Sequence, residues 1–69
     1  MRTMTDDERV KLEHMMDACG TATVLLALAE ICGWKSVHIA ECWQDTTLAK
    51  RWDKLADEVG KVAPRAEGL

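Results

Sequence analysis

The first helical pattern in the chain lies between residues 5 and 20. Apolar side chains recur there at intervals of three and four residues, at Leu12, Met15, Met16 and Cys19. This spacing places them on one face of an α-helix. Thr5 and Glu8 have the spacing of a capping box, in which each residue satisfies a backbone amide near the other. We therefore predict a helix that begins near Asp6 and ends at Gly20, which can adopt a left-handed conformation.

The second pattern is a nearly uninterrupted apolar segment at residues 22–32, in which Glu30 is the one charged residue. A helix that is apolar on all sides is typical of the centre of a domain. Thr21 or Thr23 is placed to cap its first turn, and Gly33 is predicted to end it.

The third segment, residues 35–43, is compatible with two structures. Val37, Ile39 and Trp43 could alternate along a strand, whereas Ile39, Ala40 and Trp43 share a helical face. No other segment alternates with a period of two, so a strand would lack a partner. We predict a short helix with Ser36 near its start.

The fourth segment follows Asp45, a favourable N-cap residue. Its apolar residues alternate in spacing between four and three, at Leu48, Trp52, Leu55, Val59 and Val62. This pattern has two apolar positions per heptad and predicts a seam along which the helix packs. Gly60 weakens the last turn, and Pro64 prevents the helix from continuing.

The chain has 69 residues, 48% of them hydrophobic and 30% charged, which is typical of one folded domain. We predict an all-α protein, a compact bundle of about four short helices. Residues 1–4 are expected to form a flexible N-terminus, residues 5–63 the helical domain and residues 64–69 a frayed tail. Because so short a chain builds only a small core, we expect self-association to complete the bundle.

Charge and hydropathy narrow the environment in which the chain acts. The net charge is −3 and no basic cluster is present, which argues against direct binding to nucleic acid or anionic membrane. The apolar stretch at residues 24–31 is shorter than a membrane span, and the N-terminal residues lack a secretion signal. We therefore expect a cytoplasmic protein without a membrane partner.

Candidate catalytic and metal-binding residues are few. His38 and Cys42 stand four residues apart, the spacing of two ligands on one helical face, and are the best candidates for a metal site. Paired close ligands of the Cys-x-x-Cys kind are missing, which favours ordinary helix residues. There is no glycine-rich phosphate loop and no local nucleophile with a base and an orienting group. The sequence predicts a protein that is not an enzyme and needs no cofactor.

Candidate partner-binding residues fall into two groups. The first is aromatic and basic: Trp34 and Trp43, with Lys35 beside Trp34. Tryptophan is enriched at binding hot spots; we expect Trp34 to be exposed, Trp43 to pack under the following turn and Trp52 to lie in the core. The second group is acidic and belongs to the first helix: Asp6, Asp7, Glu13 and Asp17.

Three functions remain compatible with these features. The favoured one is a helical protein-protein interaction module that self-associates as a homodimer. The alternative is a small acidic inhibitor or adaptor of a larger protein, for example one that handles nucleic acid, of the kind encoded by mobile elements. The third is a helical protein that binds a small ligand between Trp34 and Trp43.

Overall fold

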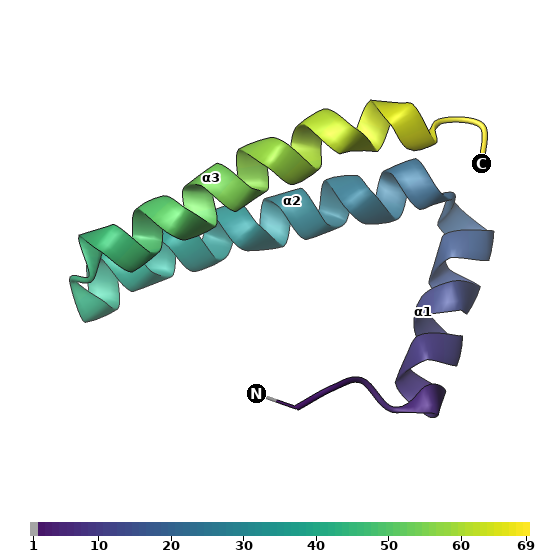
Figure 1. Cartoon of the computed structure of the whole chain (residues 1–69), viewed down its shortest axis with the longest axis horizontal. Helices are drawn as coiled ribbons and strands as arrows, with labels where there is room; N and C mark the ends of the chain where they lie inside the picture. Colours follow the sequence, from purple (N-terminus) through teal and green to yellow (C-terminus); the bar gives the residue numbers. More distant parts are fainter. Residues whose placement is uncertain (1) are drawn as a thin grey trace.

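The computed structural model describes residues 2–69, in which three α-helices and two short helical turns account for most of the chain (Figure 1). In order these are α1 (Asp6–Cys19), α2 (Thr21–His38), the π-helical turn η1 (Ile39–Trp43), α3 (Thr46–Val62) and the 3-10 turn η2 (Ala63–Ala66). No strand occurs in the described part of the chain. The prediction of an all-α fold is confirmed, with three α-helices in place of about four.

The start of α1 is the predicted capping box. The Glu8 backbone amide donates to the Thr5 hydroxyl over 3.2 Å, and the Thr5 amide donates to the Glu8 carboxylate over 2.9 Å. At the other end Gly20 has a φ of 90°, which a side chain would disfavour, and it lets the chain turn sharply into α2. The predicted threonine cap of α2 is wrong, because Gly20 itself is the N-cap and no side chain bonds there.

α2 does not end at Gly33, and residues 35–43 are not a separate helix. Gly33 lies inside α2, and the helix runs on through η1 to Trp43. A glycine inside a helix costs only about 1 kcal/mol, which packing can offset. Here Ser36 and Ile39 pack against α3 beyond the glycine, and the Ser36 hydroxyl donates to the Ala49 carbonyl over 2.8 Å. The chain turns instead at Gln44, in the left-handed region with a φ of 53°.

α3 begins at the predicted cap, where the Asp45 carboxylate accepts from the Leu48 amide over 3.0 Å. Pro64 ends the α-helix but not the helical chain, because it stands in the first turn of η2, where its missing amide is tolerated. The segment expected to fray thus begins with an ordered turn, and Ala63 and Ala66 are buried.

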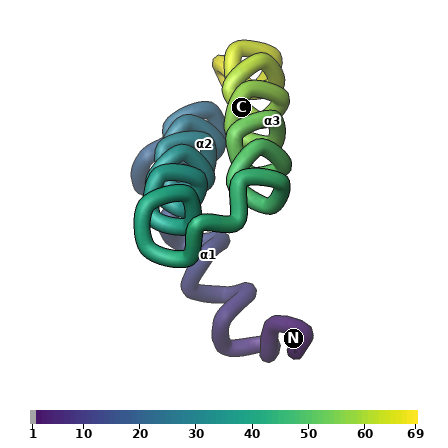
Figure 2. The backbone as a smooth tube through the Cα atoms, turned by 90° about the vertical axis from the view of Figure 1, so that its left-hand side faces the viewer, coloured from purple at the N-terminus to yellow at the C-terminus, as the bar shows by residue number. Residues whose placement is uncertain are grey.

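α2 and α3 run antiparallel and side by side as a helical hairpin (Figures 1 and 2). We call their line of contact the seam. It is formed by residues at alternating spacings of three and four: Leu25, Ala29, Cys32, Ser36 and Ile39 from α2, and Ala49, Trp52, Ala56, Val59 and Ala63 from α3. All of them are buried or half-buried. The helices approach closely, since a Cβ atom added at Gly60 would lie 3.9 Å from that of Ala29.

The predicted seam of α3 is therefore only partly right. Trp52 and Val59 lie in it, but small alanines take the other positions, while Leu55 and Val62 are exposed. Small residues can occupy a seam because they let two helix backbones come near each other, a property that a search for bulky residues overlooks.

The molecule is L-shaped, not a compact bundle. α1 contacts α2 alone among the described elements and extends away from the hairpin (Figure 2). The radius of gyration is 13.8 Å, whereas a compact chain of this length has about 11 Å. The overall dimensions are 37 × 27 × 14 Å. Each arm of the L consequently leaves a large surface uncovered by the rest of the protein.

Candidate functional site

The most distinctive surface of the protein is an uncovered apolar stripe on the hairpin. We call it the apolar face and define it by six residues: Leu28 and Ile31 of α2, and Leu48, Trp52, Leu55 and Val62 of α3. Leu48 and Trp52 are half-buried and the other four are exposed. Bulky apolar side chains thus gather outside the seam.

These residues lie on one side of the hairpin because of their register. With the exception of Trp52, which belongs to the seam edge, each directly precedes a seam residue, as Leu28 precedes Ala29 and Leu55 precedes Ala56. Successive helix residues are rotated by about 100°, so residues that precede a seam position turn to the same side in both members of an antiparallel pair. Residues that follow a seam position turn to the opposite side.

On the opposite side of the hairpin, residues that follow seam positions come together, as the helix rotation predicts. A small depression there is lined by Ser36, Ala40, Thr46, Ala49, Lys50 and Asp53. Ala40, Lys50 and Asp53 each follow a seam residue, and they come from both helices. This second side is more polar along α3, so the two sides of the hairpin differ in chemistry.

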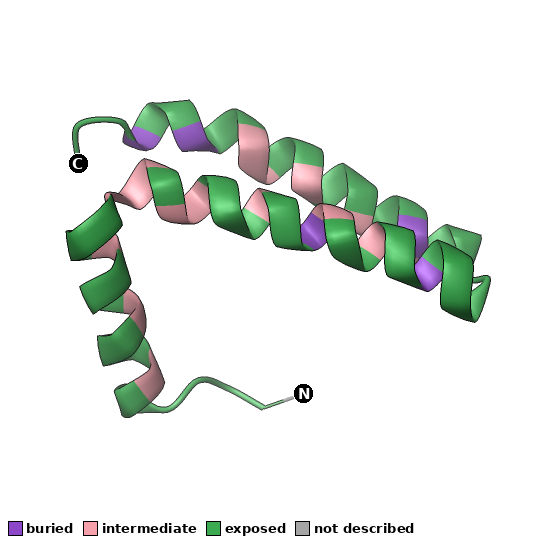
Figure 3. Cartoon of the chain, turned by 180° about the vertical axis from the view of Figure 1, so that it is seen from behind, coloured by how far each residue is buried: buried purple, intermediate pink, exposed green. Residues whose placement is uncertain are grey.

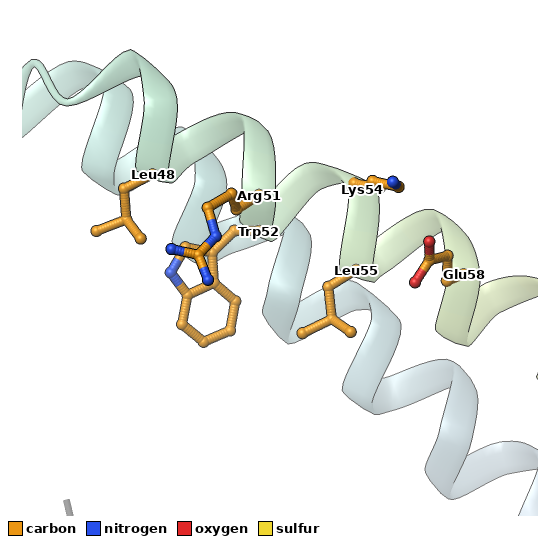
Figure 4. A pocket seen from close by; sticks show the side chains of 6 residues that line it. All are labelled: Leu48, Arg51, Trp52, Lys54, Leu55 and Glu58. Atoms are coloured by element: carbon orange, nitrogen blue, oxygen red, sulfur yellow. The ribbon is translucent and has the colours of Figure 1, made fainter.

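A shallow groove of about 530 Å³ runs along α3 on the apolar face (Figure 4). Its lining consists of Leu48, Arg51, Trp52, Lys54, Leu55 and Glu58. Figure 4 shows Leu48, Trp52 and Leu55 projecting from the same side of the helix. All of these residues come from one helix, so the groove is open and lacks the enclosing walls of a small-molecule site.

The arm formed by α1 also has an apolar side. Its half-buried residues include Leu12 and Met16, and Figure 3 shows the half-buried residues of α1 on the side turned along the hairpin. Val24 shares a stripe with Leu28 and Ile31 and is less exposed than they are, at the end of α2 next to α1. The inner side of the L is therefore apolar on both arms.

The two tryptophans that the sequence singled out as candidate binding residues, Trp34 and Trp43, are both exposed. Trp34 is 67% exposed, as predicted, and follows Ile31 by three residues, so it borders the apolar face on the outside of α2. The prediction that Trp43 packs under a turn is wrong: it is 65% exposed, with its ring edge-on to His38 at 6.2 Å. Lys35 is exposed beside Trp34. The two tryptophans do not line either groove.

The acidic residues of α1 are exposed, as their sequence positions suggested. Asp6, Glu13 and Asp17 stand seven and four residues apart and share one helical face, with Asp7 to one side. This face points away from the stripe that contains Leu12 and Met16. The Asp6 carboxylate pairs with Arg9 over 3.0 Å.

The sulfur and imidazole groups do not converge. Cys32 is buried in the seam, whereas Cys19 and Cys42 are exposed. Cys19 ends the apolar stripe predicted for the first helix and is nevertheless exposed, because α1 is covered by α2 alone. Within residues 2–69 no group of three or more His, Cys, Asp or Glu side chains is arranged to hold a metal, His38 and Cys42 included.

The best-defined charge interactions lie away from the apolar face. Arg2 binds the Glu8 carboxylate through two nitrogens at 2.6 and 2.8 Å, which together with the Thr5 amide lowers the pKa of Glu8 to about 2. Asp57 and Lys61, four residues apart on α3, form an ion pair at 3.0 Å, and Asp57 raises the pKa of the Lys61 ammonium. The first pair stabilises the start of α1 and the second stabilises the last turns of α3.

One segment satisfies a simple length and hydropathy test for membrane spans. Thr21–Trp43 forms a continuous helix of 23 residues with a mean hydropathy of 1.3, and little of it is buried in the protein. Glu30 and Lys35 would stand near the middle of such a span, where a charged residue costs about 2.5–3.5 kcal/mol.

The candidate binding residues predicted from the sequence did not include Leu28, Ile31, Leu48 and Leu55 of the apolar face. They also did not include Arg51 and Glu58, the charged residues that line the groove. Leu28 and Ile31 had been assigned to a buried core, and Leu48 and Leu55 to the seam. A signal was present in the heptad spacing of Leu48, Leu55 and Val62, which repeats beside a second heptad series of alanines. Two parallel stripes on one helix indicate two packing partners.

Comparison with known proteins adds no relative: no family model, no curated protein and no solved structure matches the chain.

Proposed function

We propose that this protein is a non-enzymatic helical interaction module that forms a homodimer through the apolar face, in the cytoplasm. The observation that carries the proposal is that one side of the hairpin gathers large apolar side chains that nothing in the chain covers. Contiguous exposed apolar patches in soluble proteins mark interaction sites.

The amount of exposed surface supports the same conclusion. The chain has 5672 Å² of accessible surface, whereas a compact monomer of 7.7 kDa exposes about 4,300 Å². The excess is about 1,300 Å², and a standard interface covers about 800 Å² on each partner. The excess is larger than the surface that one standard interface covers, so the chain exposes enough surface for a stable contact with a second copy.

The shape of the protein also suits a second hairpin. The groove on α3 is open along its length, as a helix-binding surface requires. Two hairpins packed face to face would make a four-helix bundle, a common architecture for amphipathic helices. Such a dimer buries Leu28, Ile31 and Leu55 together.

Sedimentation equilibrium tests the proposal. The wild-type protein is expected to have twice the mass of the 7.7 kDa chain. Leu55→Asp puts a carboxylate in the middle of the apolar face of both subunits and is expected to weaken the dimer by about 100-fold or more.

Val37→Asp is the matched control. Val37 is 56% exposed, more than Leu55, but it follows a seam residue and lies on the opposite side of the hairpin. This variant is expected to remain a dimer, and circular dichroism should show the same helix content in both variants. A monomeric wild type at every concentration, or a dimer that Val37→Asp disrupts and Leu55→Asp does not, would overturn the proposal.

A further inference from the structure

The apolar stripe of α3 is symmetric about Leu55. Leu48 stands seven residues before Leu55 and Val62 seven residues after it. Two charged residues border the stripe, Arg51 four residues before Leu55 and Glu58 three residues after it. The pattern therefore has opposite charges on either side of an apolar centre.

This symmetry defines how two copies can meet. In a two-fold dimer, if residue i contacts residue j of the partner, then j contacts the partner's i. An antiparallel α3 pair that crosses at Leu55 places Leu48 against Val62 of the partner subunit and Arg51 beside Glu58 of the partner subunit. The same contacts recur on the other side of the axis, so Leu48, Leu55 and Val62 each meet an apolar side chain of the partner subunit.

The two charges are available for such contacts. The ion pairs formed within residues 2–69 are Arg2–Glu8, Asp6–Arg9 and Asp57–Lys61, and none of them uses Arg51 or Glu58. Both residues are exposed and line the groove that contains Leu48 and Leu55 (Figure 4). A parallel arrangement in register would instead bring Arg51 against Arg51 and Glu58 against Glu58, which like-charge repulsion disfavours.

We propose that the homodimer is assembled by antiparallel packing of α3 on the partner's α3, centred at Leu55 and oriented by two Arg51–Glu58 ion pairs between subunits. This inference rests on the proposed function, because it assumes that the apolar face binds a second copy. It adds the register, the orientation and the residues that select them.

A charge-swap experiment tests the register. Arg51→Glu gives a chain with acidic residues at both positions, and Glu58→Arg gives a chain with basic residues at both. Each variant alone faces like charges across the dimer axis and is expected to dimerise about tenfold more weakly than wild type at low salt. Mixed together, the two variants restore both ion pairs in a heterodimer.

Native mass spectrometry of the mixture reads out the result, since the two variants differ in mass. The heterodimer is expected to exceed the half share that random pairing gives, and added salt should reduce the excess. Each variant chain carries the same substitution in the homodimer and in the heterodimer. Any effect of that substitution on the stability of α3 itself therefore cancels when the two dimers are compared. Lys50→Glu, the same change of charge one residue before Arg51 and on the opposite side of the hairpin, is expected to leave the affinity unchanged.

The outcomes separate the two proposals. Random pairing, with homodimers as stable as wild type, would overturn the register while leaving the homodimer intact. A wild-type protein that stays monomeric under the same conditions would overturn the proposed function, and the register with it.

Discussion

The seam and the apolar face lie next to each other on α3 and are built from opposite kinds of residue. The seam holds Ala49, Ala56 and Ala63, and Ala63 is only 1% exposed. The apolar face holds Leu48, Leu55 and Val62, and Leu55 is 43% exposed. In these two heptad series of α3 the alanines are buried or half-buried and the larger residues beside them are more exposed, while the bulky seam residues Trp52 and Val59 are half-buried.

The difference is the one expected if the seam joins α2 to α3 and the apolar face binds a second copy, as we propose. Alanine in the seam lets α2 and α3 approach closely but buries little apolar area per residue. Full burial of a leucine contributes about 1.5–3 kcal/mol, and part of that contribution is still unrealised on the apolar face, where Leu28 and Leu55 are each 43% exposed. A chain of 69 residues with so small a core is expected to gain much of its stability from a partner.

Enlarging a seam residue is the change expected to affect the fold of the protomer most. Ala63→Leu places three more carbons where the helices are in contact, and such overpacking costs about 1–3 kcal/mol. The free energy of unfolding in urea, followed by circular dichroism, should fall by that amount. The apolar face itself is left unchanged.

Ala27→Leu is the matched control, because Ala27 is exposed on the side of α2 away from the seam. Its effect on the free energy of unfolding should stay within about 0.5 kcal/mol. Equal losses for Ala63→Leu and Ala27→Leu would show that the seam is not tightly packed and would remove the contrast with the apolar face.

A smaller effect is expected in α1, the arm that lies outside both stripes. The pKa of Glu8 is lowered from 4.5 to about 2, first by Arg2 and then by the Thr5 amide. Because the folded state holds this carboxylate charged, the contribution to stability is complete above pH 4.5 and is lost as the pH falls through about 2.

Glu8→Gln removes that contribution at every pH. The helix content of wild type should exceed that of Glu8→Gln near neutral pH, and circular dichroism should show the difference disappear as the pH approaches about 2. A difference that persists unchanged at the acidic end would mean that the capping box does not depend on the charge of Glu8.

Local signals in the sequence predicted the ends of α1 and the start of α3. Thr5, Glu8 and Asp45 act on amides within three residues of themselves, so their effect can be predicted without knowledge of the fold. Gly33 was misjudged because its role depends on distant residues: contacts of α2 with α3 extend the helix past it. A glycine ends a helix only when packing does not outweigh its cost.

The candidate site was harder to predict for a related reason. Trp34 was selected as a candidate because tryptophan is common at binding sites, and its exposure was predicted correctly. Leu28 and Leu55 were treated as buried because apolar residues usually are, and a single chain does not reveal that a second stripe lacks a partner in its own fold. On α3 the stripe that packs against α2 is the one with the alanines, because small side chains let the two helix backbones approach more closely.

The most direct measurement of the central claim is an isotope-filtered NOE experiment on a mixture of labelled and unlabelled chains, which detects contacts between subunits only. The account predicts cross-subunit NOEs from the methyl groups of Leu48 to those of Val62, and between the two copies of Leu55. Cross-subunit NOEs confined to Leu26 and Val37 on the opposite side of the hairpin, or none at all at concentrations where the wild type is folded, would contradict it.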